Sequence, residues 1–318
     1  MQPTRPTRLA ARFIKGIALA GLLAAGPTGC FLSKFVYKPV PVANVVGDST
    51  TAIAGTKVHV YRGERYEVYG PTAMSVSTAV AQLNRSYREF AKHFGTEAPP
   101  MAVIIADSAF AITPTDAGAF AKRALHTFVY VRPHNLRDIE GVNNDLREEE
   151  IWPISARAAR ELFSAYVSAR RHLPVAVESA THSSDFHSDS LPLWFVDAVV
   201  ALLSDPGAPD RIMEYLRDHL QDAPSPGDLL RMHRLAGHAT GDSIPVTRDR
   251  RTVIGAAGVG LTLFAIEREG PRVVGKIFDR LLDGGSAQDV LRDVERIPRD
   301  ERELDRVWRA WVRDDYRR

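Results

Sequence analysis

The chain has 318 residues, of which 45% are hydrophobic, 25% charged and 8% aromatic. These proportions exclude a disordered protein and allow one large domain or two small ones. Four of the 41 basic residues but none of the 39 acidic residues lie in residues 1–29, so the remainder holds 37 basic and 39 acidic residues. The balanced remainder excludes nucleic-acid binding driven by net charge.

Residues 1–29 have the pattern of a secretory signal. Four basic residues precede an apolar run over residues 17–25, which is shorter than the ~20 residues that span a bilayer. Thr28 and Gly29 then precede Cys30, the only cysteine of the sequence. This order resembles the signal peptide of a bacterial lipoprotein, which implies cleavage before Cys30 and a lipid anchor on it, stable because several acyl chains are attached. The alternative is an ordinary secretory signal with an incidental cysteine.

Residues 30–55 are expected to form a tether, because scattered prolines and valines show neither a helical nor a strand period. We therefore expect residues 1–54 to carry no fold. An alternating β-rich stretch over residues 57–69 predicts a hairpin around Gly63.

Apolar residues at steps of four and three predict a helix over residues 74–94, capped by Gly95. Two short apolar runs, 101–106 and 127–131, are typical of buried strands. The pattern beyond residue 143 is almost entirely helical, with helices expected over 154–173, 193–203, 209–220, 255–269, 272–282, 287–296 and 301–313.

This order of elements predicts an α+β fold and not a doubly wound sheet. A small N-terminal sheet with a helix occupies residues 56–150, and a mainly helical half occupies residues 151–318.

Two stretches of the helical half carry the most informative pattern. Residues 159–166 are A-R-E-L-F-S-A-Y, and residues 191–198 are L-P-L-W-F-V-D-A. Together they resemble the peptidase MA-like group of gluzincin zinc peptidases, in which a helix written A-H-E-L-T-H precedes a helix written L-P-x-W-L-x-E-G. In that family two histidines at i and i+4 and an acidic residue bind zinc, and the intervening Glu is the general base.

The chain departs from that motif at the metal ligands. Arg160 replaces the first histidine, and a guanidinium has no lone pair to donate. Ser164 replaces the second histidine, and a neutral hydroxyl is a poor zinc ligand. Asp197 takes the place of the acidic ligand, and Glu161 alone is retained. The resemblance therefore implies a degenerate site with no metal, no catalytic residue and Glu161 as a vestigial base position.

Simpler interpretations exist for these residues. Arg157, Arg160, Glu161 and Ser164 share the polar side of their helix, and a solvated face would show the same pattern. Trp194 is expected in the core.

A polar segment between two helices holds His182, Asp185, His187 and Asp189, whose side chains suit zinc. Their spacing matches no metal motif, so a loop is favoured over a metal site. The basic cluster 248–251 is interpreted as a solvated loop, with contact to anionic lipid or phosphate as the alternative.

The leading hypothesis is a noncatalytic lipoprotein of the bacterial cell envelope, facing the periplasm or exterior. It would need no cofactor and would use a peptidase-like cleft to bind a peptide or protein, or as a scaffold. The alternative is an active zinc metallopeptidase with unconventional ligands, such as Asp197 with His182 or His187. A third hypothesis is a secreted interaction domain without lipid.

Two geometric expectations follow from the resemblance. Strands 101–106 and 127–131 should share a sheet over the helix of Glu161, with an edge near residues 129–131 to which a peptide could add. A parallel sheet with crossover helices would contradict the family. Arg160 should pair with Asp197, Glu161 or both at hydrogen-bond distance, ~2.7–3.2 Å.

Overall fold

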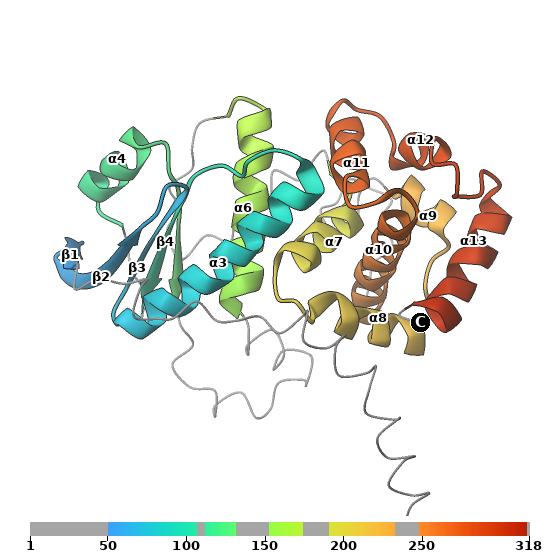
Figure 1. Ribbon diagram of the computed structural model, residues 1–318, viewed down its shortest axis with the longest axis horizontal. Coiled ribbons are helices and arrows are strands. Elements are labelled where there is room, and N and C mark those ends of the chain that lie inside the picture. The colour runs from blue at the N-terminus through green and yellow to red at the C-terminus, as the bar shows by residue number, and fades with distance from the viewer. Residues whose placement is uncertain (1–49, 107–111, 132–152, 174–190, 233–247, 317–318) are drawn as a thin grey trace, which may run out of the picture. The chain divides into compact units, whose positions relative to one another are not determined.

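A computed structural model describes residues 50–106, 112–131, 153–173, 191–232 and 248–316 (Figure 1). Its sheet has five strands in the order β1-β2-β3-β4-β5. Their bounds are β1 Thr50–Ile53, β2 Thr56–Arg62, β3 Tyr66–Gly70, β4 Met101–Ala106 and β5 His126–Val131. β1, β2 and β3 pair antiparallel, whereas β3, β4 and β5 pair parallel. The hairpin around Gly63 and the two strands predicted after it are confirmed.

Strand β1 corrects the expected start of the folded region, because residues 50–53 were assigned to the tether. The strand turns into β2 through Ala54 (φ 48°) and Gly55 (φ 78°), a two-residue turn with both residues left-handed. Such turns match the twist of a hairpin, and the Ala54 N–H donates a hydrogen bond to Asp116 Oδ2 at 3.0 Å. Ile53 is then buried on the sheet.

Two helices join the parallel strands on opposite faces of the sheet. Helix α3 (Ala73–Phe94) leads from β3 to β4 and packs on the face that carries Val68 and Val103. Helix α4 (Pro114–Lys122) leads from β4 to β5, and its Phe120 packs on the other face (Figure 1). Because both connections step in the same direction across the sheet, they have opposite hands, and one is of the rare left-handed kind.

This topology bears on the peptidase resemblance. Parallel strands with crossover helices were expected to contradict the family, and three of the five strands have that arrangement. The sheet therefore does not support the resemblance. β5 is the last strand of the described sheet, and the residues that follow it, 132–152, lie outside the described part of the chain.

The rest of the described chain is helical, which confirms the α+β class. The helices are α6 Pro153–Arg170, α7 Leu193–Leu203, α8 Ala208–Asp218, α9 Pro226–Arg231, α10 Arg248–Glu269, α11 Val273–Leu282, α12 Ala287–Arg292 and α13 Glu301–Ala310, the last continued by a π-helical turn over Trp311–Asp315. The cluster 248–251, expected in a loop, is the first turn of α10.

The largest of three apolar clusters in the described residues joins one face of the sheet to the helices. It runs from Val68 and Phe128 through Phe163 and Trp194 to Trp308. Helices α3 and α6 lie between the sheet and helices α7 to α13 (Figure 1). The described residues of the two predicted regions, 56–150 and 151–318, therefore contribute to one continuous apolar cluster. In the described ranges, no helix has the length and apolarity needed to cross a membrane.

Candidate functional site

Helix α6 carries most of the residues of the predicted site. It contacts β4, β5, α3 and α7, and its Ala159, Leu162 and Phe163 are fully buried. A half-buried polar stripe runs along the helix at steps of three and four residues. Its members are Arg157, Arg160, Ser164 and Ser168.

Glu161 does not belong to a solvated face, and that interpretation is wrong for this residue. Its side chain is 0% exposed. One carboxylate oxygen lies 2.8 Å from Arg157 Nη2 and the other lies 3.1 Å from His126 Nε2. His126 is the first residue of β5 and is itself buried. A buried carboxylate requires such partners, so Glu161 joins the sheet to the helix as an internal counterion.

Arg160 faces the neighbouring helix α7. Its Nη2 lies 3.8 Å from Asp197 Oδ1, and the two side chains are 34% and 27% exposed. The expected pairing with Asp197 is present as an ion pair, but the expected hydrogen-bond distance is wrong. Glu161 is bonded to Arg157 instead of Arg160, because Arg157 is one helical turn away on the same side of α6.

Close packing of α10 fixes the position of Asp197. A Cβ added to Gly255 would lie 3.0 Å from Asp197 Oδ2, and one added to Gly258 would lie 2.6 Å from the Trp194 carbonyl oxygen. The glycines therefore allow α10 to approach α7 closely. Trp194 is buried, as predicted.

The residues with metal-binding potential are not brought together in the described part of the chain. No group of three or more His, Cys, Asp or Glu side chains in the described ranges is placed to hold a metal ion. His182, Asp185, His187 and Asp189 lie outside those ranges.

Two residues of this site, His126 and Arg157, were not singled out as functional from the sequence. The spacing of Arg157 and Glu161, four residues on one helix, is a signal that could have identified that pair. The partnership of Glu161 with His126 spans 35 residues and depends on the sheet, so no local pattern predicts it.

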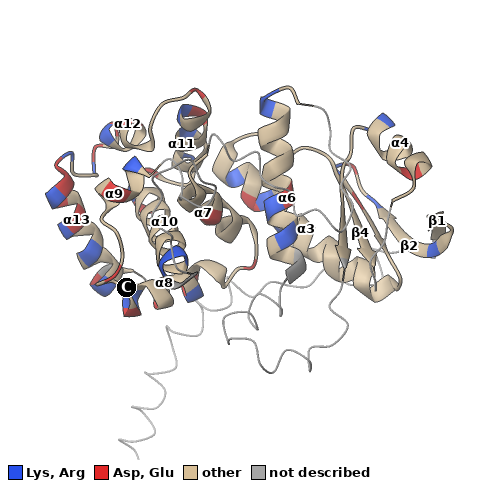
Figure 2. Ribbon diagram, turned by 180° about the vertical axis from the view of Figure 1, so that it is seen from behind, with Lys and Arg blue, Asp and Glu red and all other residues tan. Residues whose placement is uncertain are grey.

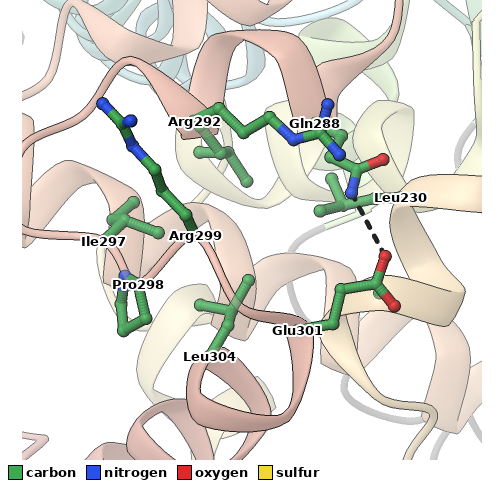
Figure 3. A pocket seen from close by; sticks show the side chains of 10 residues that line it. Leu230, Gln288, Arg292, Ile297, Pro298, Arg299, Glu301 and Leu304 are labelled. Carbon is green, nitrogen blue, oxygen red and sulfur yellow. Dashed lines mark hydrogen bonds between the residues drawn. The ribbon is translucent and has the colours of Figure 1, made fainter.

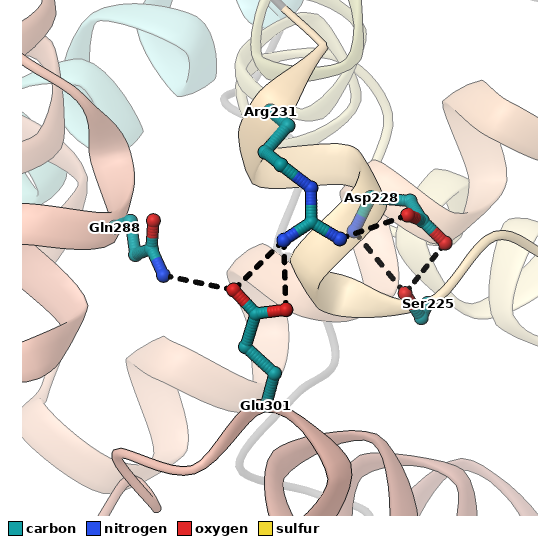
Figure 4. Close-up of polar contacts among 5 residues, drawn as sticks. All are labelled: Ser225, Asp228, Arg231, Gln288 and Glu301. Atoms are coloured by element: carbon teal, nitrogen blue, oxygen red, sulfur yellow. Dashed lines mark hydrogen bonds and ion pairs between the residues drawn. The ribbon is translucent and has the colours of Figure 1, made fainter.

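A small hollow lies elsewhere, between α9, α12 and α13 (Figure 3). Its floor includes Leu230, Leu291 and Leu304, which are buried. Glu301 on its rim accepts hydrogen bonds from Arg231 at 2.7 Å and Gln288 at 3.2 Å (Figure 4). The Arg231 hydrogen bond lowers the pKa of Glu301. These exposed groups tie α9 to α13, and no residue of α6 or α7 lines the hollow.

Charged residues elsewhere are mixed in sign. Basic and acidic positions are interspersed along α13 (Figure 2). Arg306 forms an ion pair with Glu303, and Arg309 with Asp305. Such exposed pairs contribute little individually and do not mark a site.

Neither a protein-family model nor a curated protein sequence shows significant similarity to the chain. Function is therefore inferred from the side chains of α6 and α7 and from the N-terminal sequence.

Proposed function

We propose that the protein is a membrane-anchored lipoprotein of the bacterial cell envelope whose folded domain does not hydrolyse peptides and instead binds or scaffolds a partner. The burial and the bonding of Glu161 are the observation that supports the absence of catalysis. A general base must come within hydrogen-bond reach of the water it activates. A fully buried carboxylate bonded to Arg157 and His126 is already occupied.

The ion pair across α6 and α7 supports the same proposal. Arg160 is a permanent cation at the position where the resembled family has its first metal ligand, and its partner Asp197 stands at the position of the acidic ligand. Zinc would have to share this space with a guanidinium. The sequence pattern of α6 and α7 supports a relation to the peptidases, whereas the parallel strands speak against it. The proposal that the domain is noncatalytic does not depend on this relation, because it rests on the surroundings of Glu161 and Arg160.

Zinc binding by a double variant tests the structural relation to the zinc peptidases. Arg160→His with Ser164→His restores two imidazoles at i and i+4, facing Asp197. If α6 and α7 keep the geometry of a zinc site, this variant should hold about one equivalent of zinc after dialysis, with four-coordinate geometry completed by water. Adding Asp197→Ala should weaken retention. Arg160→His with Ser168→His is the control, because its two imidazoles lie eight residues apart.

The wild-type chain decides the catalytic question. Zinc retained by the wild type after dialysis, together with proteolysis that Glu161→Gln abolishes, would establish the alternative, an active metallopeptidase with unconventional ligands. A double variant that binds no zinc would contradict the proposed relation to the peptidases. The noncatalytic proposal would then depend on the wild-type result alone.

A further inference from the structure

Two residues of the polar stripe, Arg160 and Ser164, carry hydrogen-bond donors that the described residues do not use. Within the described contacts, the Arg160 guanidinium has Asp197 at 3.8 Å as its ion-pair partner and makes no hydrogen bond. The Ser164 hydroxyl lies one turn further along the helix, is half-buried, and likewise makes none in that part of the structure. A guanidinium has five N–H donors, so contacts among the described residues leave most of the hydrogen-bonding capacity of Arg160 unused.

The charge beneath the stripe does not oppose an anion. Glu161 is fully buried, its carboxylate forms an ion pair with Arg157, and its other oxygen lies 3.1 Å from His126 Nε2. Asp197 is the carboxylate that faces Arg160, at a distance longer than a hydrogen bond. Arg157 and Arg160 balance Glu161 and Asp197 in charge, so a ligand would be recognised by directional hydrogen bonds and not by net charge.

We propose that Arg160 and Ser164 form a binding site for an oxyanion, a carboxylate or phosphate group carried by a ligand or partner. The fork of a guanidinium matches two oxygens of such a group, and the hydroxyl can donate to the same group. The inference goes beyond the proposed function and does not depend on kinship with peptidases. The carboxylate of Asp197 repels an anion at this site and weakens its binding, so simple anions should bind at millimolar concentration.

Thermal unfolding of the purified full chain in detergent provides the test. Sodium phosphate or sodium acetate is titrated against sodium chloride at constant ionic strength. Phosphate stabilises folded proteins generally, so the contribution of the site is the difference between variants. Arg160→Gln and Ser164→Ala remove the proposed donors. Arg88→Gln is the control, because Arg88 is exposed on α3.

The wild type and Arg88→Gln should show a saturable rise in Tm with at least one of the two anions. Arg160→Gln should raise the half-saturating concentration at least ~10-fold, and Ser164→Ala should raise it less. A response to acetate alone identifies a carboxylate ligand, and a response to phosphate alone identifies a phosphate group. Identical curves for the wild type and Arg160→Gln with both anions would overturn the proposal. The zinc result for the double variant has no bearing on this outcome.

Discussion

Glu161 is the polar residue of α6 whose loss the fold should tolerate least. Glu161→Gln keeps the shape of the side chain but leaves Arg157 without its buried counterion and removes the carboxylate that contacts the buried His126. Breaking a buried ion pair from one side costs ~3–5 kcal/mol, and we expect about 3 kcal/mol because Arg157 can turn towards solvent. Urea unfolding measures this loss. Ser164→Ala should change the free energy of unfolding by less than ~0.5 kcal/mol. A Glu161→Gln variant as stable as the wild type would contradict the role of internal counterion.

The Arg160–Asp197 pair should matter far less for stability. Both side chains are about one-third exposed and their closest charged atoms are 3.8 Å apart. Arg160→Ala should therefore lower the free energy of unfolding by no more than ~1 kcal/mol. The same urea titrations give this value. If Arg160→Ala lowered the free energy of unfolding as much as Glu161→Gln does, the Arg160–Asp197 pair would be as important for stability as the buried pair.

His93 should make stability depend on pH. Burial lowers its pKa below the ordinary value of 6.5, aided by Lys92 and partly opposed by the hydrogen bond to the Pro271 carbonyl and by Glu89. The unfolded chain therefore takes up this proton more readily. The stabilisation present above pH ~6.5 is lost as the pH falls towards the lower folded pKa. Urea midpoints at pH 7.5 and about 5.5 should differ less in His93→Asn than in the wild type, and an unchanged difference would assign the effect to other groups.

Helix packing gives a prediction in which two glycines behave oppositely. A Cβ at Gly258 of α10 would lie 2.6 Å from the Trp194 carbonyl oxygen, so Gly258→Ala must push α10 away from α7. Overpacking of this kind costs ~1–3 kcal/mol. A Cβ added to Gly118 of α4 would have no atom within 4 Å, so Gly118→Ala should stabilise the helix by up to ~1 kcal/mol. Thermal unfolding of both variants checks the two signs, and a stabilised Gly258→Ala would contradict the close approach of the helices.

The sequence located strands β4 and β5 and several helices well, but it placed the start of α10 at residue 255, whereas the helix begins at Arg248. Periodicity located α3, α7 and α11 to within a residue or two, because each buries a continuous apolar face. Helices α4 and α9 were missed, since nine and six residues are too few for a clear period. Their capping residues, Thr113 and Ser225, each followed by proline, are signals that could have identified both starts.

At the scale of the whole molecule, the sequence could not predict how distant parts meet. The α+β class follows from the order of elements. The parallel pairing of β3, β4 and β5, and the placement of α3 and α4 on opposite faces, depend on contacts that no local pattern encodes. The site has the same property: Arg160 and Asp197 were identified on two helices, whereas His126 reaches Glu161 only through the sheet.

The proposed anchor is a property of the whole molecule, because it sets where the domain works. Twenty residues run from Cys30 through residue 49 before β1 begins, a length that bounds the distance between the acylated cysteine and the fold at ~70 Å. Cys30→Ser removes the only thiol that can carry diacylglycerol. We expect the wild type to remain in the membrane fraction after a high-salt wash, since several acyl chains anchor a protein stably, whereas the electrostatic attachment of a basic surface is screened by salt.

Mass spectrometry of the mature N-terminus separates the outcomes of this last experiment. An acylated Cys30 in the wild type, with Cys30→Ser either uncleaved or released from the membrane, is the expected result. An unmodified Cys30 in a protein that is released without washing would show a secreted domain. An unmodified Cys30 in a protein that salt alone releases would instead locate membrane attachment on a basic surface, for which Arg250 and Arg251 in the first turn of α10 are the exposed candidates.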